Sequence, residues 1–456
     1  MEAVDVIEPR VLPRPQHPIS RSLVDRNALK VLYRLHEAGF RALLVGGSVR
    51  DLMLGRRPKD FDVATDARPN EIRRLFRNAR IIGRRFRLAH VLFKEGVIEV
   101  STFRREPEPG EQAGGPDDLL ITSDNAFGTP RQDAFRRDFT VNALFYDIAD
   151  FSVLDFTGGL EDLEARSIRA IGDPDVRFRE DPVRMMRACE LAGRLGFGIE
   201  RETQEALHRQ RTEISRSAPA RLAEELVQLL QCGRAGAALQ WALDLGLLEV
   251  QLPEAYAMLA AGQRGLGDFG RLLPVVDRLV SSGRVFKDTV LLAVLLLPSF
   301  LLRRYDVEAV AHRTLPRSEL AAMVGTVSEG FLERFSLPKA KGHELRETLL
   351  SFADLCVVPR RESARRRAAA NPFFRQGLEL FELLVEATGE GREELALWQA
   401  EAAHAPRLQL VAPAGSPAAG GGAAGGGQGA PRRRRTRRRR RRGTQGQPMS
   451  GEGNGP

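Results

Sequence analysis

Two aspartates separated by one residue carry the most informative chemistry in the sequence. Asp60 and Asp62 flank Phe61, a spacing that predicts a strand with both carboxylates on one face and Phe61 turned into the core. Carboxylate oxygens are the ligands that Mg²⁺ prefers in proteins. A pair of such ions can activate an attacking hydroxyl and neutralise a leaving pyrophosphate. The motif therefore indicates two-metal transfer chemistry.

A third acidic residue completes the candidate metal site. Glu99 stands between Ile98 and Val100, so a neighbouring strand would present its carboxylate beside the aspartate pair. An Asp-x-Asp pair alone usually belongs to a solvated loop or edge. Its combination with an apolar strand and a preceding glycine turn is much more specific, and favours a metal site made of Asp60, Asp62 and Glu99.

A glycine turn precedes the aspartates and suits the binding of phosphate. Gly46 and Gly47 lie between an expected strand over 41–45 and an expected helix over 48–54. Glycine lets the backbone approach a phosphate closely, and the N–H groups of a helix start favour an anion. Arg50 can add a charge-assisted hydrogen bond. Most Gly-Gly turns are purely structural, and the sequence here has neither the G-x-G-x-x-G of a Rossmann site nor the G-K-[ST] of a P-loop.

Short strands and helices alternate over residues 22–172, which predicts an α+β domain with a small mixed sheet. Helices are expected over 25–38 and 48–54, and strands over 41–45, 60–65, 89–93, 97–103, 142–147 and 153–156. The stretch 106–116 is rich in Gly, Pro and Glu, and predicts a mobile loop. Residues 1–20 are proline-rich and predict an irregular segment.

From residue 181 onward strand patterns fade and the chain is expected to be all-α. Helices are expected over 182–195, 219–230, 236–245, 287–297 and 373–387. The final stretch, 415–456, has too few apolar residues to offset chain entropy, so we expect it to be disordered. These patterns divide the chain into segments 1–20, 21–175, 176–245, 246–410 and 411–456.

The formal net charge of +9 comes from the end of the chain. Residues 411–456 contain ten arginines and one acid, Glu452, so the remainder is formally neutral. A neutral body with a cationic arm indicates a polyanionic partner. The arginines between Arg432 and Arg442 would bind RNA phosphates without reading sequence. A targeting signal or a protein-docking arm remains the alternative for this run.

Cysteine and hydropathy patterns bound the compartment. Cys189, Cys232 and Cys356 lie far apart in helical patterns and form neither a disulfide framework nor a zinc site. No basic-then-apolar signal sequence begins the chain. The longest aliphatic run, 290–297, ends at Pro298 and is shorter than the roughly 20 residues that span a bilayer. We expect a soluble, cytoplasmic protein without a membrane span.

Over about residues 40–245 the motifs resemble, in matching order, those of the tRNA nucleotidyltransferase and bacterial poly(A) polymerase branch of the DNA polymerase beta superfamily. Besides the glycine turn and the aspartates, residues 136–142 (R-R-D-F-T-V-N) resemble the second motif of this branch. Residues 155–163 (D-F-T-G-G-L-E-D-L) resemble the turn that closes its head domain. Residues 180–187 (E-D-P-V-R-M-M-R) resemble the nucleotide-selecting motif at the start of the neck helix. Beyond about residue 245 no residue-by-residue match extends.

The resemblance implies a polymerase-beta-like nucleotidyltransferase head over 21–175 and a helical neck over 176–245 that selects the nucleotide and binds RNA. A helical body over 246–410 and the Arg-rich tail follow. The residues implied to hold the triphosphate are Gly46, Gly47, Arg50 and Arg137. The residues implied to hold two Mg²⁺ ions are Asp60, Asp62 and Glu99.

The same resemblance assigns the remaining site residues. Asp138 would act with the catalytic aspartates by contacting the ribose or stabilising the site. Asp181 and Arg184 would read the base edge, and Arg187 would support them or contact phosphate. Independently, an acceptor and a donor three residues apart on a helix lie on one face and can imitate a Watson–Crick edge. The other interpretation is a salt-bridged helix start with Asp181 capping before Pro182, and both can hold.

Three features favour poly(A) addition over CCA addition. Residues 81–91 (I-I-G-R-R-F-R-L-A-H-V) resemble the element that separates bacterial poly(A) polymerases from CCA-adding enzymes. Eight arginines and one acid lie between Arg68 and Arg87, with apolar residues interleaved, so this element is expected to dock while its arginines meet RNA or nucleotide phosphate. The cationic tail suits an enzyme that handles many RNAs. No histidine precedes an aspartate, so the His-Asp phosphohydrolase doublet of some CCA-adding enzymes is absent. His90 is interpreted as structural or as part of the docked element, not as a metal ligand.

We therefore expect a poly(A) polymerase that adds AMP from ATP to RNA 3′ ends without a template and releases pyrophosphate. It would act in mRNA processing and decay, with RNA-degradation machinery as a candidate partner. The alternatives are CCA addition to tRNA and a catalytically idle RNA-binding scaffold. A scaffold predicts at least one eroded carboxylate, whereas Asp60, Asp62 and Glu99 are all present.

Overall fold

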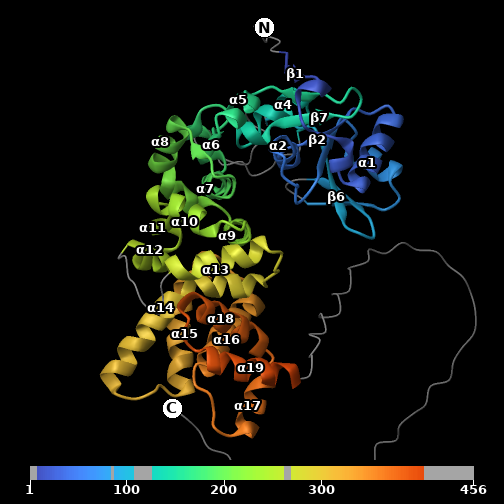
Figure 1. The fold of residues 1–456 in the computed structure, drawn as a ribbon. Helices are drawn as coiled ribbons and strands as arrows, with labels where there is room; N and C mark the ends of the chain where they lie inside the picture. The colour runs from blue at the N-terminus through green and yellow to red at the C-terminus, as the bar shows by residue number, and fades with distance from the viewer. Residues whose placement is uncertain (1–7, 84–86, 107–125, 261–268, 405–456) are drawn as a thin grey trace, which may run out of the picture. The chain divides into compact units, whose positions relative to one another are not determined.

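The computed structural model describes residues 8–83, 87–106, 126–260 and 269–404, all within one compact unit, Met1–Pro406. Figure 1 shows the strands gathered in the first part of the chain, and helices alone from α11 onward. Of the expected loop over 106–116, only residue 106 is among the described residues. The expected disordered tail lies outside them. The boundaries expected between head, neck and body stay predictions.

A mixed sheet forms the scaffold of the N-terminal part, as expected, and it is larger than expected. In the described residues it has eight strands in the order β1-β8-β7-β2-β3-β6-β5-β4. Neighbouring strands are antiparallel except β3 and β6, which are parallel. The strands are β1 (Arg10–Leu12), β2 (Ala42–Val45), β3 (Asp62–Thr65), β4 (Ala79–Ile82), β5 (Leu88–Leu92), β6 (Val97–Thr102), β7 (Leu144–Asp147) and β8 (Val153–Asp155).

Two strands correct the sequence interpretation. Strand β1 pairs with β8, so the segment 1–20 is not irregular throughout. Three residues are too few to show the side-chain alternation of a strand. Strand β1 forms because the edge of β8 is open to pairing. Strand β4 pairs with β5, so the arginine-rich element 81–91 belongs to two adjacent strands of the sheet. Residues 84–86 between them lie outside the described residues.

Helices make up most of the rest. The helices are α1 (Arg26–Glu37), α2 (Gly47–Met53), α3 (Pro69–Leu75), α4 (Pro130–Phe135), α5 (Gly159–Glu164), α6 (Pro174–Glu180), α7 (Val183–Leu195), α8 (Arg201–Gln210), α9 (Pro219–Leu230), α10 (Ala235–Asp244), α11 (Leu247–Gln251), α12 (Pro253–Ala260), α13 (Phe269–Ser281), α14 (Asp288–Ala311), α15 (Arg317–Arg334), α16 (Lys339–Leu355), α17 (Glu362–Ala369), α18 (Phe374–Thr388) and α19 (Arg392–His404). Short 3-10 helices cover η1 (Arg14–Gln16), η2 (Arg21–Leu23), η3 (Thr140–Asn142) and η4 (Arg211–Arg216).

The half expected to be all-α contains one exception. Strand β10 (Gly198–Ile199) pairs in parallel with β9 (Ser167–Ile168), which precedes the helical part. Two residues carry no strand pattern of their own, so only the tertiary contact defines them. The pair ties the end of α7 to the segment that follows the head's closing turn.

Helix α14 is longer than the sequence predicts. It was expected to end before Pro298, because proline lacks the N–H of an internal helix hydrogen bond. The observed helix passes through Pro298 and continues to Ala311. Its residues from Thr289 to Leu301 are almost all buried, and this packing outweighs the local cost of proline. None of the helices in the described ranges has the length and apolar character needed to cross a bilayer.

The expected turn over 155–163 is confirmed, and its sequence explains its geometry. The buried Asp155 carboxylate accepts hydrogen bonds from the backbone N–H groups of four successive residues, from Thr157 to Leu160, at 2.9–3.0 Å. Gly159 must be glycine, because a Cβ there would lie 2.3 Å from the Thr140 carbonyl oxygen. This close approach holds α5 against η3, beside the candidate site.

Candidate active site

One cavity of about 660 Å³ brings together most of the candidate residues. Its walls come from the turn before α2, the segment before β3, the segment 137–142, and helices α7 and α9. Of the eleven candidates only Glu99 is not part of its lining. The ten that line it are Gly46, Gly47, Arg50, Asp60, Asp62, Arg137, Asp138, Asp181, Arg184 and Arg187. Motifs more than a hundred residues apart in sequence therefore converge.

The two aspartates face the cavity, but only one of them is on a strand. Asp62 is the first residue of β3, and Asp60 lies in the irregular segment before it, which corrects the expected strand over 60–65. The reason lies in β2: Val45, its last residue, pairs with Asp62, and the chain then turns away at Gly46. Asp60 has no strand partner, yet both carboxylates are exposed and line the same cavity.

Glu99 lies on the strand next to Asp62, as expected. The two residues are paired in register between the parallel strands β3 and β6. The pKa of Asp62 is raised to about 6, first because the protein around the cavity partly desolvates its carboxylate and second because of the negative charge of Glu99. Glu99 itself contacts His90 on β5, with 3.3 Å between Nε2 and Oε1.

The carboxylates fit a Mg²⁺ site of the kind that is completed by substrate. Within the described residues, no three His, Cys, Asp or Glu side chains are grouped closely enough to hold a metal ion by themselves. Mg²⁺ is commonly bound by one or two carboxylates together with substrate phosphates. After burial, the negative charges of Glu99 and Asp60 also raise the pKa of Asp62, and a bound cation would offset these charges.

The glycine turn adopts a conformation that needs glycine. Gly46 has φ +73°, and a Cβ there would lie 3.0 Å from Nη1 of Arg137. Helix α2 begins at the next residue. Arg50 lines the cavity, but it is buried and its guanidinium donates to Asp51 and Asn142. Its contacts therefore stabilise the turn whether or not it also reaches a phosphate.

Arg137 is held at the mouth of the turn by a buried carboxylate. Asp133 on α4 accepts hydrogen bonds from Nε and Nη2 of Arg137 at 3.2 and 2.9 Å. Burial opposes ionisation of Asp133, but Arg137 and Arg136 outweigh it and the pKa of this carboxyl is lowered. Nη1 of Arg137 donates to the Asn142 carbonyl oxygen at 3.4 Å. Arg137 is thus pre-positioned beside Gly46.

Asp138 connects the sheet domain to the helices. Its Oδ2 accepts from Nε of Arg187 on α7 at 2.8 Å, and its Oδ1 accepts from the Asn142 side chain at 3.1 Å. Burial alone would raise the pKa of Asp138, but the charge of Arg187 and these hydrogen bonds hold it well below its usual range. Arg187 also pairs with Glu225 on α9 at 3.4 Å. The chain of contacts runs from the sheet domain through α7 to α9.

Asp181 and Arg184 are not on one face of one helix, which corrects the expected arrangement. Asp181 is the first residue after α6, and α7 starts only at Val183. Both carboxylate oxygens of Asp181 accept from Arg221 on α9, at 2.8 and 2.9 Å, so Asp181 does not cap α7 with its side chain.

Arg184 is buried, and its guanidinium donates to backbone carbonyl oxygens of Arg136 and Arg177. Burial, helped by nearby Arg177, lowers the pKa of Arg184 to about 10. Arg184 also pairs with Glu180 at 3.5 Å, so its charge is partly compensated within the protein. Both Asp181 and Arg184 line the cavity.

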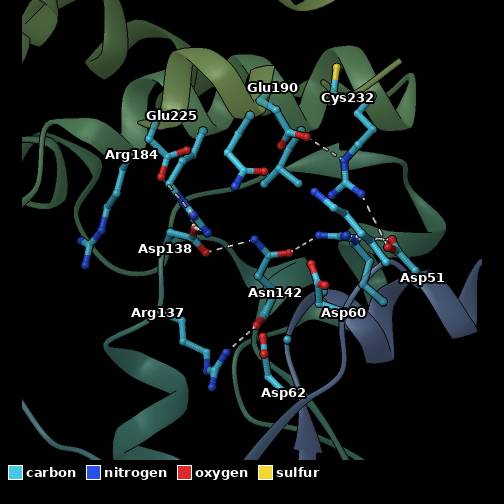
Figure 2. Close-up of a pocket in the computed structure, with 18 of the residues that line it drawn as sticks. Asp51, Asp60, Asp62, Arg137, Asp138, Asn142, Arg184, Glu190, Glu225 and Cys232 are labelled. Carbon is cyan, nitrogen blue, oxygen red and sulfur yellow. Dashed lines mark hydrogen bonds and ion pairs between the residues drawn. The ribbon is translucent and has the colours of Figure 1, made fainter. Parts of the chain in front are cut away.

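Figure 2 shows Asp60 and Asp62 on one side of the cavity and Glu225, Glu190 and Cys232 on the other, with Asp138 and Asn142 between them. Three of the residues that hold the candidates in place were not identified from sequence: Asn142, Arg221 and Glu225. Asn142 lies inside a quoted motif. Arg221 and Glu225 have the spacing of an ordinary helix-surface ion pair, so nothing local links them to the site. The arrangement offers carboxylates for metal, guanidinium groups for phosphate, and fixed donors and acceptors for a base.

Two family models match this chain. The Poly A polymerase head domain matches residues 42–169, which include β2, the aspartates and the segment 136–142. The model described as the probable RNA and SrmB-binding site of polymerase A matches residues 196–259, which include α9 and its Arg221 and Glu225. Both matches thus contribute residues to the cavity wall.

Known proteins give the same family. The chain is 53% identical over 228 residues to Poly(A) polymerase I of Salmonella typhi, a match that spans about half the length of each chain. It is 35% identical over 401 residues to Poly(A) polymerase I of Haemophilus influenzae, covering 85% of this chain and 86% of the relative. A crystal structure of the Bacillus stearothermophilus CCA-adding enzyme with CTP shares the fold, with a TM-score of 0.61 and 24% identity over 85% of this chain and 83% of that one. Because the Haemophilus match extends over most of both chains, this protein belongs to the bacterial poly(A) polymerase family.

Proposed function

We propose that the cavity transfers AMP from ATP to the 3′-hydroxyl of RNA, without a template and with release of pyrophosphate. One observation carries the proposal: a single cavity holds the exposed Asp60 and Asp62 in one wall and Asp181 and Arg184 in another. The first pair suits metal and phosphate, and the second suits a nucleobase. The similarity to Poly(A) polymerase I of two bacteria supports adenylate as the added group.

The proposed roles follow from where the side chains are held. Asp60 and Asp62 bind Mg²⁺ with Glu99 beside them, and Gly46, Gly47 and Arg137 bind the triphosphate at the turn before α2. Two bound Mg²⁺ ions would supply activation of the attacking hydroxyl and neutralisation of the leaving pyrophosphate. Asp138 orients Arg187 and Asn142 and so fixes α7 relative to the turn. Arg50 stabilises the turn through Asp51 and Asn142.

Base selection is proposed to depend on Arg221 as well as on Asp181 and Arg184. Arg221→Gln removes a two-point contact to Asp181, so we expect the KM for ATP to rise about tenfold with a smaller change in kcat, as the loss of a charged hydrogen bond worth about 1.5 kcal/mol would give. Steady-state kinetics with ATP checks this. Arg209→Gln is the matched control, since Arg209 makes the same kind of contact to Asp175 outside the cavity. Equal effects of the two changes would contradict the role.

The arginine tail is proposed to tether RNA. Deleting residues 415–456 removes all ten tail arginines, so the KM for RNA should rise and the slope of log K against log salt should flatten by about 0.7 for each lost phosphate contact. Initial rates at several salt concentrations measure both. Deleting only 415–430 shortens the arm but keeps the arginines, and should leave the salt slope unchanged. A full deletion with the parental salt slope would exclude tethering.

The nucleotide and RNA preferences test the function itself. The protein is incubated with Mg²⁺, each nucleoside triphosphate separately, and either a generic RNA oligomer or tRNA that lacks its CCA end. Long products with ATP alone on both RNAs are the expected result. CTP incorporation restricted to the trimmed tRNA would instead establish CCA addition, and no incorporation with any nucleotide would favour an RNA-binding scaffold. A cytoplasmic location, a role in mRNA processing and decay, and contact with RNA-degradation machinery are part of the proposal.

A further inference from the structure

A row of four polar side chains crosses the sheet through four adjacent strands. Arg80 on β4 is directly opposite His90 on β5, His90 is opposite Glu99 on β6, and Glu99 is opposite Asp62 on β3. Directly paired residues in a sheet project from the same face, so the four side chains lie side by side. The row starts one residue before the arginine-rich element 81–91 and ends at the carboxylate that faces the cavity.

Contacts within the row are specific at its centre. The His90 ring reaches Glu99 with 3.3 Å between Nε2 and Oε1, and the His90 side chain is only 23% exposed, whereas that of Glu99 is 49% exposed. The Glu99 carboxylate makes no other hydrogen bond or ion pair among the described residues. The neighbours of His90 on β5, Ala89 and Val91, are buried and hold the strand in the sheet, and the His90 side chain has fewer torsions than that of Glu99. His90 therefore limits where the flexible Glu99 carboxylate can lie.

We propose that His90 is a positioning residue that holds Glu99 beside Asp62 for the catalytic cation. This inference rests on the proposed function, because it takes Glu99 as part of the Mg²⁺ site. A glutamate has three side-chain torsions, and fixing them before the ion arrives removes an entropy cost from binding. Carboxylates that bind metal are in turn held by hydrogen bonds, and loss of such a partner typically weakens metal affinity or activity by about 10–100-fold.

The inference also gives the element 81–91 a role inside the protein. The sequence predicted that its arginines meet RNA or nucleotide phosphate, and that His90 is structural or part of the docked element and not a metal ligand. In the structure, this element supplies the histidine that contacts the third carboxylate. The alternative is that His90 and Glu99 form an ordinary surface ion pair, which would contribute little to stability or to cation binding. The two interpretations differ in whether loss of His90 weakens cation binding.

Cation binding can be measured without the reaction. Mn²⁺ serves as the probe, and its binding to the full-length protein is followed by electron paramagnetic resonance in the presence of a non-hydrolysable ATP analogue and the absence of RNA. His90→Leu should weaken Mn²⁺ binding about tenfold or more. His90→Gln should recover most of the loss, because its side-chain amide can still donate to Glu99. His36→Leu is the matched control: His36 is exposed on α1 and does not belong to the row, so the Mn²⁺ affinity of this variant should equal that of the parent.

Two further variants, Glu99→Gln and His90→Asn, test whether His90 acts through Glu99. In a Glu99→Gln background, His90→Leu should have no further effect on Mn²⁺ affinity. His90→Asn, whose shorter amide cannot reach Glu99, should resemble His90→Leu, which gives a comparison with His90→Gln even where leucine impairs folding. Parental Mn²⁺ affinity in His90→Leu and His90→Asn would overturn the proposal, as would a loss that Glu99→Gln does not absorb. If His90→Leu weakens Mn²⁺ binding but the parent protein adds no AMP, the proposed function is refuted and the positioning role stands.

Discussion

Replacing Asp62 with alanine is expected to lower the rate of AMP transfer by at least about 10³-fold while the protein stays folded. The carboxylate faces the cavity and makes no hydrogen bond within the described residues that the fold needs, so its removal leaves no buried group unpaired. Loss of a metal ligand removes several kcal/mol of transition-state stabilisation, and about 4 kcal/mol corresponds to 10³ in rate. Initial rates with ATP and a generic RNA oligomer measure the effect.

Asp60→Ala should behave like Asp62→Ala, although Asp60 lies off the strand. Glu95→Ala is the control, since Glu95 is an exposed acid in the turn between β5 and β6, outside the cavity. Its rate should stay within about twofold of the parent, as surface changes away from special features usually have small effects. A rate for Asp62→Ala within tenfold of the parent would refute metal binding by this residue.

Replacing Asp138 is expected to cause the largest loss of stability in the site. Asp138→Ala leaves Arg187 without its closest partner, where the two groups now approach within 2.7 Å. Breaking a buried ion pair costs about 3–5 kcal/mol, but the Arg187 side chain is 42% exposed to the cavity, so we expect about 2 kcal/mol. Urea unfolding followed by circular dichroism measures the loss. Adding Arg187→Met to this variant should recover part of it, and no recovery would contradict the ion-pair explanation.

The contact between Asp138 and Arg187 should also make the stability of the protein depend on pH. The pKa of Asp138 in the folded protein is below its unfolded value of about 3.9, so its stabilisation is fully present above about pH 5 and is lost as the pH falls. The difference in unfolding free energy between the parent and Asp138→Asn should therefore shrink by about 1 kcal/mol between pH 7 and pH 3. An equal difference at both pH values would show that ionisation of Asp138 does not stabilise the fold.

The sequence predicted which residues line the cavity better than the contacts that hold them. The strand–glycine–helix pattern placed Gly46 and Gly47 correctly, because glycine and the helix start have local causes. The order of the motifs predicted that Asp62, Asp138 and Asp181 converge, since the resemblance supplied a fold for them. The contact between Asp181 and Arg221 spans 40 residues and has no local pattern, so it was not predicted.

The incorrect predictions from the sequence also have physical causes. Asp60 was placed on a strand because its alternation with Phe61 and Asp62 is regular, but a strand also needs a partner, and β2 ends at Val45. Asp181 and Arg184 have helical spacing, yet Pro182 separates α6 from α7. Pro298 was taken as a helix end, but burial of the surrounding apolar residues carries α14 past it. For Asp60 and Pro298, tertiary contacts outweigh a correct local preference, whereas at Asp181 the following proline separates the two helices.

The fate of label from ATP in the presence of two matched RNAs tests the central claim most directly. The protein is given ATP labelled at the α- or γ-phosphate and an RNA oligomer that ends either in a 3′-hydroxyl or in a 3′-deoxy nucleotide. We predict one AMP incorporated for each pyrophosphate released with the hydroxyl-ended RNA, and neither product with the deoxy-ended RNA or with Asp62→Ala. Pyrophosphate release that does not require the RNA 3′-hydroxyl, or incorporation that survives Asp62→Ala, would contradict AMP transfer to RNA in this cavity.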